Sequence, residues 1–96
     1  MGESQGVSAE IKQHIDNIVY LLDQIANDFG VPRNIRAISQ EAIECLQQLD
    51  EEENTPGFCA SNSRSLLDEV SQDLNCPLHI RTKLYQVLSM LEQIQD

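Results

Sequence analysis

A chain of 96 residues with a net charge of −10 and no lysine or arginine cluster is a poor match for nucleic acid or an anionic membrane surface. Its content of 41% hydrophobic and 23% charged residues is typical of a globular domain, and the lack of Trp indicates an aliphatic core. The odd number of cysteines, with no signal peptide and no membrane-spanning apolar run, predicts a cytoplasmic protein outside the membrane.

Residues 9–50 are predicted to form a first helical hairpin, preceded by a flexible N-terminus at residues 1–8. One apolar stripe at spacings of four and three comprises Ile11, Ile15, Ile18, Leu22, Ile25 and Phe29. Gly30 then favours a helix end, and Pro32 favours the start of a new helix. A second stripe comprises Ile35, Ile38, Ala42, Cys45 and Leu49. We therefore expect two antiparallel helices with a very short connection.

Residues 51–58 are predicted to be an acidic linker, and residues 59–96 a second hairpin. Four consecutive acidic residues occupy positions 50–53 and precede a Pro-Gly pair. The first stripe of the second hairpin contains Leu67, Val70 and Leu74, and the second contains Ile80, Leu84, Val87, Leu91 and Ile94. Toward the N-terminal end of this stripe, the positions equivalent to Ile18, Ile15 and Ile11 of the first hairpin are occupied by Ser63, Ala60 and Pro56. The start of the third helix is therefore not fixed by the sequence.

The two hairpins are related by an internal repeat. Residues 21–50 align with residues 66–95 at a constant offset of 45 without a gap, and the shared pattern is LLD(Q/E)(I/V)xxDxxxPxxIR. Because each hairpin needs its twin to cover its apolar face, the repeat predicts one domain over residues 1–96. Its expected fold is all-α, an antiparallel up-down four-helix bundle of two tandem hairpins with pseudo-twofold symmetry.

The most specific polar feature of the repeat is an Asp/Arg pair around each turn, Asp23 with Arg36 and Asp68 with Arg81. Antiparallel helices bring the members of each pair to the same height. The leading interpretation is an interhelical salt bridge that fixes the register of each hairpin. The alternative makes the two arginines a binding site for a small anionic ligand, supported by the aspartates.

Other polar residues carry weaker signals. Asp28 and Asp73 precede the turn prolines by four residues, where a carboxylate can cap the following helix; a pair for acid–base chemistry is the alternative. Cys76 and His79 have the spacing of half a zinc site but lack further spaced ligands. The acidic run at 50–53 lacks the spacing of a calcium loop. The sequence therefore predicts neither a metal nor a cofactor.

The repeat resembles that of a family of short acidic archaeal proteins of uncharacterised function. The matching segments read LLDQIANDFGVPRNIR at residues 21–36 and LLDEVSQDLNCPLHIR at residues 66–81. The resemblance covers most of residues 11–95 and implies a compact all-helical bundle. It implies no activity, and this chain departs from the pattern at Asn75 and Cys76.

The absence of a catalytic motif makes an enzyme the least favoured class, since His14 and His79 fall on different predicted helices. The function stays unknown at this level, and the leading hypothesis is a non-catalytic cytoplasmic module for protein interaction or assembly. Its acidity predicts a partner with a basic surface and binding that weakens with salt. Self-association is a variant of this hypothesis, through Tyr20, Leu21, Ile43 and Leu88. The alternative function is an anionic-ligand binder that uses Arg36 and Arg81.

Overall fold

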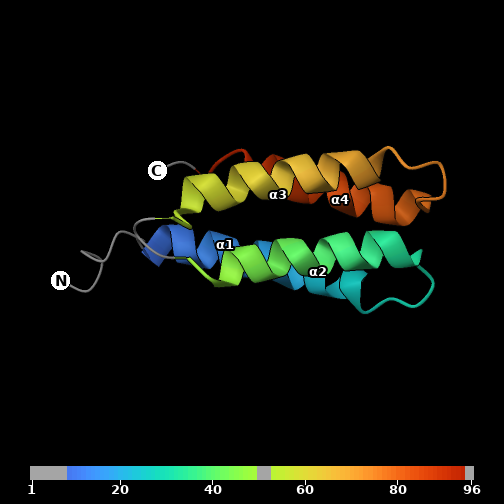
Figure 1. Ribbon diagram of the computed structural model, residues 1–96, viewed down its shortest axis with the longest axis horizontal. Coiled ribbons are helices and arrows are strands. Elements are labelled where there is room, and N and C mark those ends of the chain that lie inside the picture. The colour runs from blue at the N-terminus through green and yellow to red at the C-terminus, as the bar shows by residue number, and fades with distance from the viewer. Residues whose placement is uncertain (1–8, 50–52, 95–96) are drawn as a thin grey trace.

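The computed structural model describes residues 9–49 and 53–94, which form four helices and no strand. They are α1 (Ala9–Ala26), α2 (Arg33–Gln47), α3 (Pro56–Ser71) and α4 (Leu78–Leu91). Successive helices run in opposite directions, so that the α1–α2 hairpin lies beside the α3–α4 hairpin (Figure 1). The all-α class is thereby confirmed. The predictions for residues 1–8 and for acidic residues 50–52 lie outside the described residues.

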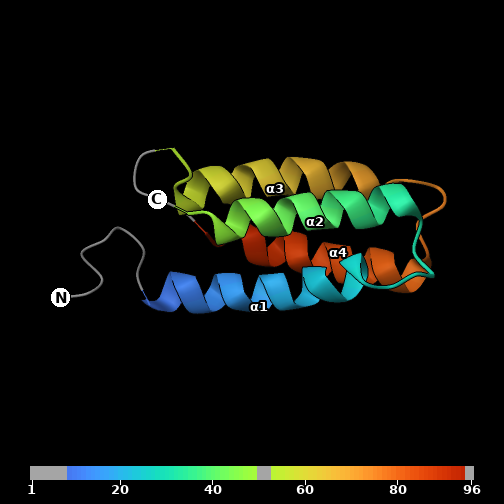
Figure 2. The ribbon, with the colours of Figure 1, turned by 60° about the horizontal axis from the view of Figure 1, so that its bottom comes forward.

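The helices occupy the corners of a square in chain order. α1 packs against α2 and α4, and α3 packs against the same two helices (Figure 2). The two helix–helix turns therefore lie at one end of the bundle, and the α2–α3 connection lies at the other. The pseudo-twofold relation between the hairpins stays a prediction.

The core is aliphatic, and all four helices contribute to it. Its largest fully buried side chains are Ile18, Leu22, Ile25, Ile35, Leu46, Leu67, Ile80, Leu84 and Leu91. The assignment of Phe29 and Leu74 to the apolar stripes is wrong, because these side chains are 87% and 96% exposed. α1 ends at Ala26 and α3 at Ser71, so both residues lie in the turns, where the helical periodicity no longer places them on the core face.

The two turns share one pattern of hydrogen bonds at an offset of 45 residues. The backbone N–H of Val31 donates to the Asp28 carbonyl and that of Cys76 to the Asp73 carbonyl, each at 3.0 Å. The Asp28 carboxylate accepts from the Gly30 N–H at 2.9 Å, and the Asp73 carboxylate accepts from the Asn75 N–H at 2.8 Å. These bonds correct the prediction that the aspartates cap the next helix. Each carboxylate instead closes its own turn, since an Asp side chain readily bonds the backbone two residues on.

The third helix starts inside the stretch predicted as linker. Thr55 is its N-cap, and the Thr55 hydroxyl accepts from the Phe58 N–H at 3.3 Å. Pro56 follows as the first helical residue, where its missing N–H would have no intrahelical partner. The predicted boundary of the second hairpin at residue 59 is therefore three residues too late, because the cap and the first residues of α3 lie in the stretch predicted to be the acidic linker.

Two serines are buried in the core, where the repeat would place large residues. Ser63 stands at the position of Ile18, and Ser39 stands at that of Leu84. Both are completely buried, and within the described part of the chain neither hydroxyl has a hydrogen-bond partner. At these two positions of the repeat, one hairpin thus has a bulky apolar side chain and the other has a serine whose hydroxyl is unsatisfied.

We expect Ser63→Ala to raise the free energy of unfolding by about 1–2 kcal/mol. A buried hydroxyl without a partner costs about 1–3 kcal/mol in desolvation, and Ala is also the better helix former. Urea unfolding followed by circular dichroism measures the change, with Ser61→Ala, at an exposed position of the same helix, as control. A loss of stability in Ser63→Ala would mean that the hydroxyl has a partner.

Candidate interaction surface at the turn end

Large apolar side chains project from the end of the bundle that carries the two turns. Phe29 lies in the first turn, Leu74 holds the equivalent place in the second, and Leu78 begins α4. Their exposed fractions are 87%, 96% and 73%. We call these three residues the turn-end surface. Exposed large apolar residues gathered at one end of a protein are typical of an interaction site.

The turns that carry this surface are held to each other as well as closed internally. The Asn34 side-chain amide, in the first turn of α2, donates to the Asp73 carboxylate at 3.0 Å across the two hairpins. The Asn75 N–H and then the Asn34 amide lower the pKa of the Asp73 carboxyl group below its ordinary value, because both stabilise the charged form. The tips are thus presented on a fixed scaffold.

Both repeat arginines bind the turns. Arg36 donates from Nε to the Val31 carbonyl at 3.0 Å, and its guanidinium lies 5.3 Å from the centre of the Phe29 ring. Arg81 donates from Nη2 to the carbonyls of Asp73 at 3.0 Å and of Cys76 at 3.5 Å. These donors satisfy carbonyls of the irregular backbone. The guanidinium groups of Arg36 and Arg81 thus already donate to backbone carbonyls, which weakens the hypothesis that they form an anion site.

The predicted salt bridges do not form. Among the described residues, 9–49 and 53–94, no ion pair joins Asp23 to Arg36 or Asp68 to Arg81. Both carboxylates are exposed on their helices, where Asp23 accepts from the Asn27 amide at 3.0 Å and Asp68 from the Gln72 amide at 3.5 Å. The arginines reach the turn carbonyls instead, because a half-buried guanidinium gains more from desolvated backbone acceptors than from an exposed carboxylate.

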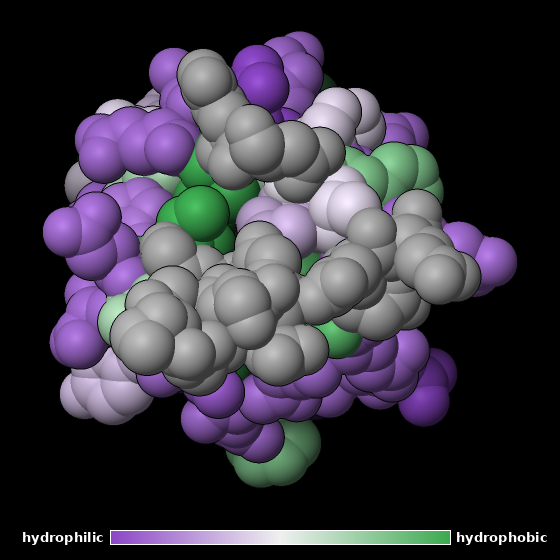
Figure 3. All heavy atoms as spheres, turned by 90° about the vertical axis from the view of Figure 1, so that its left-hand side faces the viewer, coloured by the Kyte–Doolittle hydropathy of each residue, from purple (hydrophilic) through white to green (hydrophobic). Residues whose placement is uncertain are grey.

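Charge is distributed unevenly along the bundle. Residues 23–36 and 68–83, which carry the turns, contain five acidic and four basic residues, so nearly all of the net charge of −10 lies elsewhere in the chain. Figure 3 looks onto the opposite end, where hydrophilic side chains form the rim and apolar atoms are visible between them. The turn end is therefore the less charged end of an acidic molecule.

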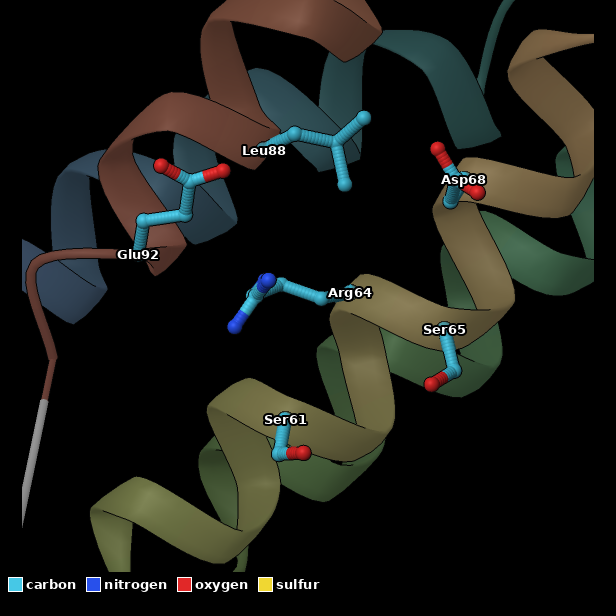
Figure 4. A pocket seen from close by; sticks show the side chains of 6 residues that line it. All are labelled: Ser61, Arg64, Ser65, Asp68, Leu88 and Glu92. Carbon is cyan, nitrogen blue, oxygen red and sulfur yellow. The ribbon is translucent and has the colours of Figure 1, made fainter.

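A polar groove separates α3 from α4 on one side of the second hairpin. It has a volume of about 330 Å³ and is lined by Ser61, Arg64, Ser65, Asp68, Leu88 and Glu92. Figure 4 shows Arg64 extending from α3 into this space, with Glu92 on the α4 side. Two carboxylates beside one guanidinium make the groove a poor site for an anion, and the predicted arginines do not line it.

The other candidate residues do not assemble a metal or catalytic centre. His14 lies with Nε2 2.8 Å from the Met90 carbonyl, whereas His79 is exposed near the turns. Cys76 is buried, and burial raises the pKa of its thiol. Among the described residues, no three His, Cys, Asp or Glu side chains are grouped to hold a metal ion. No helix in the same part of the chain has the length and apolarity needed to cross a membrane.

Two features were missed by reasoning from the sequence. The turn-end surface could have been found from its neighbours, since Asp28 with Gly30 and Asp73 with Asn75 are turn residues that flank Phe29 and Leu74. The proximity of Cys45 to Cys59 depends on which helices are neighbours, so it could not be read from the sequence.

The positions named for self-association differ in exposure. Tyr20 is exposed, Leu21 and Leu88 are half-buried, and Ile43 is buried.

Comparisons with known proteins agree with the fold and carry no assigned activity. The model of an uncharacterised protein family, UPF0147, matches residues 2–94. A UPF0147 protein of Desulfurococcus amylolyticus is 47% identical over 93 residues, which cover 97% of each chain. A crystal structure from Thermoplasma acidophilum, of the same family, superposes with a TM-score of 0.75 at 35% identity, covering 88% of this chain and 96% of that one. A crystal structure described as a protein of unknown function superposes with a TM-score of 0.79 at 33% identity, covering 94% of this chain and 97% of that one.

Proposed function

The chain belongs to the uncharacterised protein family UPF0147, and for it we propose a non-catalytic role as a module that binds a partner protein. The turn-end surface is the proposed binding site. The observation that carries the proposal is the near-complete exposure of Phe29 and Leu74 at equivalent places in two turns that are closed by hydrogen bonds. Both helical hairpins thus present an apolar tip on the same side of the molecule.

The geometry suits binding by insertion into apolar pockets. A small number of large residues supplies most of the energy of a typical protein interface, and a backbone already closed by hydrogen bonds loses less conformational entropy on binding than an open loop does. The Arg36 guanidinium lies 5.3 Å from the centre of the Phe29 ring, so the two together offer an aromatic and a cationic group. The closed turns keep the tips at a fixed separation.

The charge distribution points to a basic partner. A net charge of −10 attracts basic proteins over long range and accelerates their encounter. The turn end itself is nearly neutral, so that a partner need not desolvate many charges to cover Phe29, Leu74 and Leu78. We expect a partner with apolar pockets in a basic surface, whose association rate falls as salt is added.

Site-specific photo-crosslinking in host extract tests the proposal. A benzoylphenylalanine residue placed at position 29 or 74 should crosslink to a partner protein, whereas the same residue at position 20 on α1 should not. Tyr20 is the matched control because it is an aromatic residue, 66% exposed, on the side of the bundle. The double variant Phe29→Ser/Leu74→Ser should bind the captured partner at least about 10-fold more weakly than Tyr20→Ser does.

Other outcomes would contradict the proposal. Equal crosslinking at positions 20, 29 and 74 would mean that the turn end is not a specific surface. A product with twice the mass of this chain would assign the surface to self-association. Capture of an acidic partner, with binding unaffected by salt, would contradict the proposed role of charge.

A further inference from the structure

Cys45 and Cys59 are brought together where the two hairpins meet. Cys45 lies in the last turn of α2 and Cys59 in the first turn of α3. Their Sγ atoms are 2.8 Å apart, and the Cys59 thiol also lies 3.1 Å from the Cys45 carbonyl oxygen. The sulfur atoms are thus closer than the roughly 3.5–4 Å at which non-bonded heavy atoms pack. Neither side chain needs to cross the core to reach the other.

The two thiols differ in access to solvent. Cys59 is completely buried, whereas Cys45 is half-buried at the edge of the core. Cys76, the third cysteine, lies in the α3–α4 turn at the opposite end of the bundle, so it does not compete for either partner. A reagent from solvent therefore meets Cys45 first, and Cys59 stands behind it.

We propose that Cys45 and Cys59 are a redox site that forms an intramolecular disulfide by exchange with a small disulfide of the glutathione class. Cys45 loses its proton and its sulfur attacks the disulfide, forming a mixed disulfide and releasing one thiolate. Cys59 then loses its proton and its sulfur attacks Cys45 Sγ, releasing the second thiolate. The protein loses two electrons and two protons, and the reagent becomes two thiols.

The bond would add a second covalent link between the two hairpins, beside the chain that already connects them. It would connect α2 to α3 and close the loop that contains the acidic residues 50–53. Cross-linking a loop of this length restricts the unfolded chain, so the oxidised protein should unfold at a temperature about 10 °C or more above that of the reduced protein. Redox conditions would thereby set how firmly the hairpins are held together. This site lies away from the turn end and does not depend on the proposed function.

Oxidation of the full chain with oxidised glutathione tests the inference. The protein is then unfolded in denaturant, so that the buried Cys76 thiol can react, free thiols are blocked with N-ethylmaleimide, and the intact mass is measured. Wild type should lose two hydrogen atoms, retain one reactive thiol and carry no glutathione. Cleavage after glutamate separates the two cysteines, because Glu44 and the glutamates at 51–53 lie beside and between them. Their peptides should remain joined until a reductant is added.

Three variants sharpen the experiment. Cys76→Ala should form the bond as wild type does and retain no reactive thiol. Cys59→Ala should stop at the mixed disulfide on Cys45. Cys45→Ala cannot form the intramolecular disulfide, and it should form a glutathione adduct more slowly than Cys59→Ala does. The rise in unfolding temperature should appear in wild type and Cys76→Ala alone.

The inference fails if wild type stops at a glutathione adduct on Cys45, or if the oxidised product is a dimer of chains. It also fails if wild type stays reduced under conditions in which Cys59→Ala accumulates its adduct. In that case Cys59 would protect the half-buried Cys45 thiol from the reagent instead of forming a bond with it. Circular dichroism of each variant before oxidation confirms that the comparison is between folded proteins.

Discussion

Replacing Leu67 by Ala is expected to lower the free energy of unfolding by about 2–5 kcal/mol, the range found when a buried leucine is truncated. Leu67 is completely buried on α3, in the core shared by all four helices. Truncation removes apolar contacts and leaves a cavity that the surrounding helices cannot close completely. Urea unfolding at neutral pH measures the change.

Leu74→Ala is the matched control, since it makes the same chemical change seven residues further along the same predicted stripe. Leu74 is 96% exposed, and its truncation should change stability by less than about 0.5 kcal/mol. Two equal losses would mean that Leu74 packs into the core. Loss of partner binding in Leu74→Ala, with stability unchanged, would separate its role in binding from folding.

Replacing Arg81 by Ala is expected to lower the free energy of unfolding by about 2 kcal/mol. The half-buried guanidinium donates to the Asp73 and Cys76 carbonyls, and its loss leaves two turn acceptors without their charged donor. The Arg81 Nε is buried and has no hydrogen-bond partner within the described residues, which reduces the net benefit of the side chain. Arg64→Ala, at an exposed position in the α3–α4 groove, should cost far less.

A double-mutant cycle decides between the two roles considered for Arg81. If the arginine stabilises the turn, Arg81→Ala and Asp68→Ala should be additive within about 0.5 kcal/mol. Strong coupling between them would instead restore the interhelical salt bridge expected from the repeat. The same cycle on Asp23 and Arg36 should also be additive, because Arg36 donates to the Val31 carbonyl.

Local pattern was a good guide to the buried faces of α1 and α4. The residues of α1 from Ile15 to Ile25 on the predicted stripe are buried, as are Ile80, Leu84, Val87 and Leu91 on α4.

On α2 the predicted stripe was wrong in part, because Ile38, Cys45 and Leu49 are half-buried. The fully buried face of α2 contains Ser39, Ile43 and Leu46 beside Ile35 and Ala42. Prediction failed at the ends of the helices. Phe29 and Leu74 continue the spacing in sequence, but the backbone leaves the helix before it reaches them.

The polar residues were harder to interpret, because a side chain with several accessible partners takes the one that is least hydrated. Arg36 and Arg81 could reach an aspartate or a turn carbonyl, and sequence spacing favoured the aspartate. The carbonyls of an irregular turn lack helical partners and are partly desolvated, so they bind the guanidinium more strongly. The same reasoning applies to Asp28 and Asp73, which close their turns.

The amino-acid sequence by itself determined the all-helical class, the start of the second helix of each hairpin directly after a proline, and the 45-residue correspondence of the turns, because these depend on local periodicity and turn chemistry. The tertiary structure alone decided which helices are neighbours, and with them the contact of Cys45 with Cys59 and the placing of both apolar tips at one end. Such relations join residues far apart in the chain. They follow from how four amphipathic faces pack together, which no single stretch of sequence specifies.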